Sequence, residues 1–178
     1  VTLFQQTNFG DNMINSFIVA FATSFVSLAV SIAAAYAFSR FRFRGRLAIM
    51  VSFLTINMCP TVLLLIPLYS IMRSLGILYT PLALILAYST FTIPFAVWLL
   101  TDYINDLSPS LEEAALIDGC TRKQAFFKVV LPLTVPGIIA TGSYIFITAW
   151  NEFVFAVMFT NQGSRTLPVA LQAFVGQF

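Results

Sequence analysis

The sequence predicts an all-α integral membrane protein, a polytopic helical bundle. Hydrophobic residues make up 59% of the chain and charged residues 9%, whereas soluble domains average about 45–50% and about 25%. The mean hydropathy is +0.90. The nine basic and seven acidic residues are also clustered, so that they leave long uncharged stretches, at residues 12–39, 47–72, 74–101 and 129–151.

Each uncharged stretch is long enough to cross a membrane. A helix needs roughly 20 mostly apolar residues, at about 1.5 Å each, to cross a hydrocarbon core of about 30 Å. A soluble bundle with buried helices is the alternative, but it does not account for four such stretches in one short chain. We therefore predict four transmembrane helices, at about 13–39, 47–72, 77–101 and 131–159.

The basic residues predict the orientation, because cytoplasmic loops near span ends collect Lys and Arg. Seven of the nine bases fall in two clusters that lie two spans apart and hence on one side: Arg40, Arg42, Arg44, Arg46, Arg122, Lys123 and Lys128. This predicts a cytoplasmic loop at about 102–130. We interpret the four arginines chiefly as a topology anchor, with contact to a cytoplasmic protein partner as the lesser alternative.

Both chain ends are then expected on the non-cytoplasmic face. Because Val1 is not Met, we expect a fragment of a larger bundle. The opening residues 1–12 are expected to be an outer surface segment. The tail 160–178 is either an outer loop, which we favour, or the start of another span.

Prolines predict kinks in two of the spans. Pro60 and Pro67 lie in the second, and Pro81 and Pro94 in the third. An interior proline removes a backbone donor and clashes with the preceding turn, which kinks or breaks the helix. Prolines are common in membrane helices, so they are weak markers of a transport pathway.

Two short helices are predicted in the cytoplasmic loop, within "LEEAALIDGCTRKQAFFKVVLPLTVPG". Ser108 and Pro109 are typical of a helix start, and Gly119 of a left-handed helix end. Thr121 with Gln124 forms a capping-box pattern, which predicts a second helix from Arg122 toward Pro132. The loop is therefore expected to be helix, glycine elbow and helix.

The first of these helices places Glu113 opposite Leu111, Ala115 and Asp118. A carboxylate between aliphatic side chains can dock on a partner. The alternative is a solvated amphipathic helix lying on the membrane surface. An anionic inner leaflet repels the acids of this loop, so we favour a protein partner with basic residues.

A second candidate site lies in the fourth predicted span, within "AWNEFVFAV". A charge near mid-membrane costs about 2.5–3.5 kcal/mol on insertion scales, so Glu152 is expected to face protein or water. Asn and Glu side chains offer hydrogen bonds and Trp an aromatic contact to a polar solute, which makes Trp150, Asn151 and Glu152 candidates for a translocation path. The open alternative is a structural role for Glu152, near the outer interface or paired with another subunit.

The composition argues against an enzyme. The chain has no His, which excludes His-based triads and HExxH zinc sites, and no Gly precedes a Lys, which excludes a Walker A loop. We expect no catalytic residue, metal or cofactor in this chain, and no nucleic-acid partner.

The cytoplasmic loop also matches a known motif. Glu113-Ala114-Ala115, three residues, Gly119, nine residues, Val129, one residue and Leu131-Pro132 resemble the EAA signature of the membrane subunits of binding-protein-dependent ABC importers. Further segments resemble the carbohydrate-uptake subgroup that contains the maltose-type second permease subunit: "AAAYAFSRFRFRGR", "EEAALIDG", "VVLPLTVPG", "AWNEFVFAV" and "TLPVALQAF".

This resemblance implies that residues 1–178 are part of one ABC type-1 transmembrane domain of six spans, without the first and the last. It implies a cytoplasmic ATPase dimer that binds ATP and Mg²⁺, a second permease subunit, an extracytoplasmic sugar-binding protein, and a bilayer that is the cytoplasmic membrane of a bacterium or archaeon. It further implies that alternating access is driven through a set of ATPase-coupling residues, which are Glu113, Ala114, Ala115, Gly119, Leu131 and Pro132.

Three alternatives remain open at this point. The first is an ABC importer permease for a non-sugar solute, and the second is an ATP-independent channel or secondary transporter. The third concerns the EAA motif, in which the small Ala114 and Ala115 either allow close approach of the ATPase or pack against neighbouring loop helices.

Overall fold

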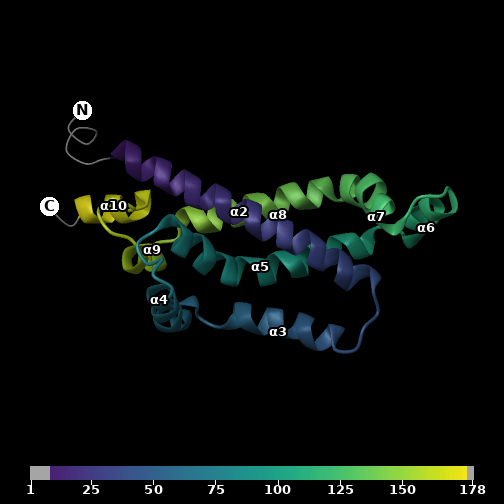
Figure 1. The fold of residues 1–178 in the computed structure, drawn as a ribbon, viewed down its shortest axis with the longest axis horizontal. Helices are drawn as coiled ribbons and strands as arrows, with labels where there is room; N and C mark the ends of the chain where they lie inside the picture. Colours follow the sequence, from purple (N-terminus) through teal and green to yellow (C-terminus); the bar gives the residue numbers. More distant parts are fainter. Residues whose placement is uncertain (1–8, 176–178) are drawn as a thin grey trace.

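The computed structural model describes residues 9–175, in which three long helices lie side by side (Figure 1). They are α2 (Phe9–Arg40), α5 (Pro81–Asp106) and α8 (Leu131–Asn151), each of which packs against the other two. All three are long and apolar enough to cross a membrane. Residues 9–175 contain no β-strand, and the predicted all-α membrane bundle is confirmed.

The second predicted span, 47–72, is broken rather than kinked. It consists of α3 (Arg46–Met58), the 3₁₀ turn η1 (Thr61–Leu64) and α4 (Leu65–Ser74), and the chain bends by 100° between the two halves. Cys59 and Pro60 are both extended, with ψ of 138° and 122°. Pro60 disfavours a helical residue before it and offers no N–H to continue the helix, which explains the break.

The other predicted boundaries also shift. The predicted spans 13–39 and 77–101 fall on α2 and α5, but α5 continues to Asp106 and so enters the predicted loop. The predicted span 131–159 begins with α8 and is interrupted at Glu152 and Phe153, before the short helix α9 (Val154–Phe159). Which residues a bilayer would cover stays a prediction.

Small residues bring the long helices close together. A Cβ atom at Gly137 of α8 would lie 2.8 Å from Cγ of Tyr103 on α5, and one at Gly142 would lie 2.9 Å from Cδ1 of Leu28 on α2. In lipid, close packing of this kind holds helices together where the hydrophobic effect does not. The bundle is completed by fully buried alanines: Ala20, Ala35, Ala83, Ala87, Ala96 and Ala156.

Many buried hydroxyl groups in the helices form a hydrogen bond within their own helix. Ser and Thr side chains donate to the carbonyl four residues earlier, which removes an unpaired polar group from an apolar setting. This pattern is found at Ser24, Ser89, Thr92, Thr101, Thr134 and Thr160.

The described part of the tail folds back on the first long helix. The helix α10 (Leu167–Val175) begins where the Leu167 N–H donates to Ser16 Oγ at 2.7 Å. Asn15 Nδ2 donates to the carbonyls of Gly163 and Arg165, each at 3.3 Å. Residues 1–8 of the predicted opening segment and residues 176–178 of the tail lie outside the described residues.

The cytoplasmic loop of the prediction lies at the opposite end of the molecule from α10. Figure 1 shows α6 (Pro109–Ile117), α7 (Arg122–Ala125) and the α2–α3 connection at one end, and α10 and the start of α2 at the other. Both basic clusters therefore fall at one end of the bundle, as the charge pattern predicts.

Candidate functional site

The helix α6 begins and ends where the sequence predicts. Pro109 is its first residue, after Ser108 with ψ of 126°. The Ser108 hydroxyl does not cap the helix as expected; it shares a hydrogen bond of 2.7 Å with Ser110 Oγ instead. At the other end Gly119 has φ of 88°, a left-handed conformation that glycine adopts without a steric cost.

A Schellman motif closes the end of α6. The Cys120 N–H donates to the Ala115 carbonyl at 3.0 Å, and the Gly119 N–H donates to the Leu116 carbonyl at 3.1 Å. These two bonds satisfy carbonyls that the helix end would otherwise leave unpaired. The predicted glycine elbow is confirmed.

The second helix of the loop begins with the predicted capping box. The Gln124 N–H donates to Thr121 Oγ1 at 3.3 Å, and the Thr121 N–H donates to Gln124 Oε1 at 2.8 Å. The chain then forms α7, the π-helical turn η2 (Phe126–Val130) and α8 as one element from Arg122. Pro132 has no N–H for the carbonyl four residues earlier, so a wider turn just before it accommodates the proline.

Glu112 fixes α6 to the end of α2. Its carboxylate accepts a hydrogen bond from Tyr36 Oη and forms an ion pair with Arg40, whose Nε lies 3.0 Å from Glu112 Oε2. The two side chains of the ion pair are 11% and 9% exposed. We call Tyr36, Arg40 and Glu112 the clamp.

The clamp is extended on both sides. Arg40 Nη2 donates to the Leu107 carbonyl at 3.2 Å, just after α5 ends, and Arg40 Nη1 donates to Ser39 Oγ at 3.2 Å. The Tyr36 ring packs on Phe126 of η2, with 4.6 Å between the ring centroids. The clamp therefore connects α6 with the ends of α2 and α5 and with the start of the α8 element.

Sequence reasoning missed the clamp. It treated Arg40 as part of a topology anchor and did not connect it with Glu112. The two residues are 72 positions apart, and a local pattern does not pair them. The available signal was that Glu112 shares a helix face with Ala115, the face that is buried.

The opposite face of α6 is open. Glu113, Ala114 and Ile117 are exposed, and Ile117 is 86% exposed. The two small residues of the predicted motif lie on different faces of α6, because Ala114 is on this exposed face and Ala115 is buried. The outward stripe of Ser110, Glu113, Ala114 and Ile117 follows the three-and-four spacing of one helix face. We call these four residues the outer stripe.

The remaining residues of the predicted coupling set lie at helix boundaries. Gly119 forms the elbow after α6, and Leu131 and Pro132 are the first two residues of α8. Their role in coupling stays a prediction.

Glu152 lies at the break between α8 and α9 and caps the second helix. Its Oε1 accepts from the Phe155 N–H at 3.0 Å and its Oε2 accepts from the Ala156 N–H at 3.1 Å. A carboxylate at this position satisfies two backbone donors that α9 leaves free. This interaction accounts for a charge inside an apolar segment.

Glu152 also lines a cavity of about 270 Å³ between α3, α5 and α8. Phe91 and Tyr144 supply aromatic walls, and Asn57 and Thr148 supply polar groups. In the described chain, the hydroxyls of Tyr144 and Thr148 form no hydrogen bond. The cavity combines aromatic faces with unused donors and acceptors, which suits a polyhydroxylated ligand.

The other two predicted path residues lie elsewhere. Trp150 stacks on Phe146 with 5.7 Å between ring centroids, and Asn151 Nδ2 donates to the Ile147 carbonyl at 2.9 Å. Both border a separate depression beside Phe17. Of the three, only Glu152 lines the cavity.

The described residues provide no metal centre, because residues 9–175 contain no group of three or more His, Cys, Asp or Glu side chains that could hold an ion. The structure offers two features that suit binding. One is an exposed helix face that the clamp holds to three long helices, and the other is a small polar and aromatic cavity beside a helix break.

A family model described as "Binding-protein-dependent transport system inner membrane component" matches residues 26–177. The chain belongs to this family. Its membership confirms the resemblance drawn from the EAA motif, since the description names an inner membrane component of a binding-protein-dependent transport system. The roles of the individual EAA residues stay predictions.

Relatives within this family have carbohydrate transport in their names. The chain is 40% identical over 167 residues to the sulfoquinovosyl glycerol transport system permease protein SmoH of Agrobacterium fabrum, covering 93% of this chain and 59% of that protein. It is 38% identical over 163 residues to the trehalose/maltose transport system permease protein MalG of Thermococcus litoralis, covering 91% and 59%.

A solved structure shares the fold. A chain from a bacterial ABC transporter involved in the import of the acidic polysaccharide alginate matches with a TM-score of 0.79 and 25% identity, covering 95% of this chain and 58% of that one. The chain thus spans a little under three fifths of the length of each of these three relatives.

Proposed function

We propose that this chain is part of the permease subunit of an ATP-driven sugar importer, in which α6 docks on a cytoplasmic ATPase dimer that binds ATP and Mg²⁺. A second permease subunit completes the pore, and an extracytoplasmic sugar-binding protein delivers the solute at the cytoplasmic membrane of a bacterium or archaeon. The outer stripe is the observation that supports this most directly, because the clamp keeps that face turned away from the bundle.

The docking contact centres on Glu113. Its carboxylate is exposed and has no ion-pair partner in residues 9–175, and the small Ala114 beside it leaves room for close approach. We propose that a basic residue of the ATPase pairs with Glu113 while Ile117 enters an apolar recess. Movement of the ATPase then reaches α2, α5 and α8 through the clamp and the elbow, which produces alternating access.

Glu113→Ala tests the docking contact in the full-length transporter reconstituted with its ATPase and binding protein. Coupling free energies of about 1–3 kcal/mol correspond to roughly 5- to 150-fold effects, so we expect sugar uptake per ATP hydrolysed to fall about tenfold. The control is Asp118→Asn, which removes a neighbouring exposed acid that is not in the outer stripe. Normal uptake and normal ATPase binding in Glu113→Ala contradict the proposal.

We further propose that the sugar passes the cavity beside Glu152. Thr148→Val removes a free hydroxyl at nearly constant volume, and losing one neutral hydrogen bond of about 0.5–1.5 kcal/mol raises the KM for uptake roughly two- to tenfold. Thr141→Val on the same helix is the matched control, since Thr141 is fully buried and its Oγ1 has no partner in the described chain. An unchanged KM in Thr148→Val contradicts this path.

Two alternatives predict different results in the same preparation. A permease for a non-sugar solute shows ATPase stimulation by a binding protein loaded with that solute and none with sugars. An ATP-independent channel or secondary transporter shows uptake without the ATPase. Both relatives described above are named for carbohydrate transport, which favours the sugar importer.

A further inference from the structure

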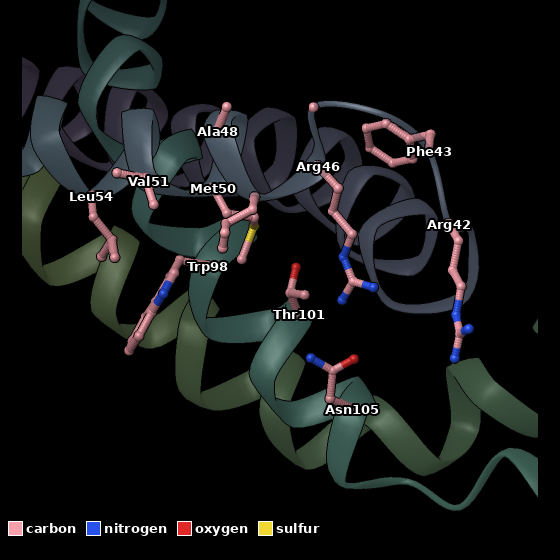
Figure 2. Close-up of a pocket in the computed structure, with 12 residues that line it drawn as sticks. Arg42, Phe43, Arg46, Ala48, Met50, Val51, Leu54, Trp98, Thr101 and Asn105 are labelled. Carbon is pink, nitrogen blue, oxygen red and sulfur yellow. The ribbon is translucent and has the colours of Figure 1, made fainter.

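A cavity of about 690 Å³ lies between α3 and α5, at the end of the bundle that carries the basic clusters. Figure 2 shows its two parts. Met50, Val51, Leu54 and Trp98 form an apolar trough along the two helices, and polar side chains gather toward the α2–α3 connection. No Asp or Glu lines the cavity.

The polar part contains two arginines without an acidic partner. Arg42 and Arg46 line the cavity, and neither forms an ion pair in residues 9–175. In Figure 2 both side chains extend away from the connection, and Arg46 points toward Thr101 and Asn105 of α5. Two positive charges beside an apolar trough, with no acid to neutralise them, favour a ligand that carries a negative charge.

Asn105 supplies a further donor from the other wall. Its Oδ1 accepts from Ser39 Oγ at 2.8 Å, and that Ser39 oxygen itself accepts from Arg40 Nη1. With Oδ1 facing Ser39, Nδ2 is left with two N–H groups. Nδ2 has no acceptor in the described chain, so it is available to a ligand oxygen.

The start of α3 adds backbone N–H groups, which carry partial positive charge like the arginines. Gly45, at φ of 90°, precedes the helix and offers no side-chain cap, and the first turn contains no acid. The N–H groups of Leu47 and Ala48, two residues that line the cavity, have no acceptor among the bonds of the described residues. Free N–H groups at a helix start attract anions.

We propose that this cavity binds an anionic phospholipid of the cytoplasmic leaflet. The phosphate lies between Arg42, Arg46 and the Asn105 amide, and an acyl chain lies in the trough against Trp98. Basic pockets between membrane helices on the cytoplasmic side bind anionic headgroups, and each base near the surface contributes about 1 kcal/mol. A free anion satisfies the donors but leaves the trough empty, which is why a lipid fits better.

The position of Trp98 supports the same occupant. Trp side chains concentrate where membrane helices meet the headgroup region, because the ring is apolar and the N–H is polar. Trp98 is only half-buried by the protein. A lipid chain beside α3 would cover it, and would also cover Val51 and Leu54, which are 51% and 39% exposed.

The test measures lipid binding to the delipidated full-length transporter by native mass spectrometry, with phosphatidylglycerol or phosphatidylcholine added. We expect phosphatidylglycerol to bind more tightly. Arg42→Gln and Arg46→Gln are each expected to weaken it about fivefold. The matched control is Arg44→Gln, because Arg44 belongs to the same basic cluster, is exposed and does not line the cavity.

A second measurement needs no loss of charge. A photoreactive amino acid in place of Met50 is expected to cross-link to phosphatidylglycerol in vesicles that contain it. Cross-linking to another protein segment instead would overturn the proposal, since the cavity is then filled by protein. Equal binding of the two lipids, or an equal loss in Arg44→Gln and Arg46→Gln, would overturn it as well.

Discussion

The bundle of α2, α5 and α8 and the arm formed by α3, η1 and α4 are held in different ways. Fully buried side chains occur along α5, including Leu84, Val97 and Leu100, whereas in the described structure α3 and η1 bury no residue and α4 buries only Met72. Lipid tails are as apolar as leucine, so specific polar and close contacts decide which helices stay together. The bundle has such contacts, and α3 packs mainly on α5.

The attachment of α6 resembles that of the bundle helices rather than that of the arm. Although α6 is short and largely exposed, the clamp makes it part of the bundle, so a force on the outer stripe acts on α2, α5 and α8 together. The arm bends by 100° between α3 and α4, and it buries far fewer residues than the bundle does. A transporter of the alternating-access type needs both a rigid unit and a part that moves against it.

The largest expected effect comes from breaking the clamp with Glu112→Ala. Arg40 then loses its acid while remaining mostly buried, and removing one partner of a buried pair costs about 3–5 kcal/mol. We expect the full-length permease in detergent to lose about 3 kcal/mol of stability, at the lower end because both side chains keep some exposure. Amide exchange in α6 should rise toward the rate found in the arm.

Glu113→Ala is the matched control for this experiment, because it removes an adjacent acid from the exposed face of the same helix. Its expected cost is within about 0.5 kcal/mol, as for other surface changes. Equal destabilisation by the two substitutions would show that the clamp does not hold α6. The helix α6 would then be as loosely attached to the bundle as the arm is.

The contrast also shows which features a sequence can predict. The elbow at Gly119 and the capping box of Thr121 and Gln124 depend on neighbours in the chain, so local pattern was sufficient. The fold class followed from the spacing of charges. The clamp joins residues 72 positions apart and depends on how α6 packs on α2, which no local rule contains.

The prolines show the same limit in the arm and in the bundle. Pro60 breaks its span, but Pro94 lies inside the continuous helix α5. Pro67 is the third residue of α4, in the first turn, where a helix leaves its N–H groups unpaired in any case. The difference between Pro60 and Pro94 depends on whether neighbouring helices compensate for the missing N–H, as they do for the buried Pro94, and that is a property of packing.

Glu152 illustrates a residue whose importance was predicted but whose partners were not. The cost of an intramembrane charge indicated a special environment, and the structure shows a helix cap beside a cavity. Trp150 and Asn151 were grouped with it because they are adjacent in the chain. A helix turns about 100° per residue, so adjacent residues face different surroundings.

The smallest expected effect separates the two glycine contacts within the bundle. Gly137→Ala places a methyl group 2.8 to 3.0 Å from three ring atoms of Tyr103, including Cγ, so the ring or the helices must move. Gly142→Ala meets only the end of the flexible Leu28 side chain at 2.9 Å. Both substitutions gain roughly the same helix propensity, up to about 1 kcal/mol. Their difference therefore isolates the contact of α8 with its neighbour.

We expect Gly137→Ala to be less stable than Gly142→Ala by about 1–2 kcal/mol, since overpacking of a tight contact typically costs about 1–3 kcal/mol. Thermal unfolding of the full-length permease in detergent measures this difference, with Leu63→Ala in η1 as the reference for the arm, because Leu63 is 69% exposed. If all three variants unfold at the same temperature, α5 and α8 are no more tightly joined than the arm is, and the rigid unit that we infer behind the elbow would have to be α2 and α5 alone.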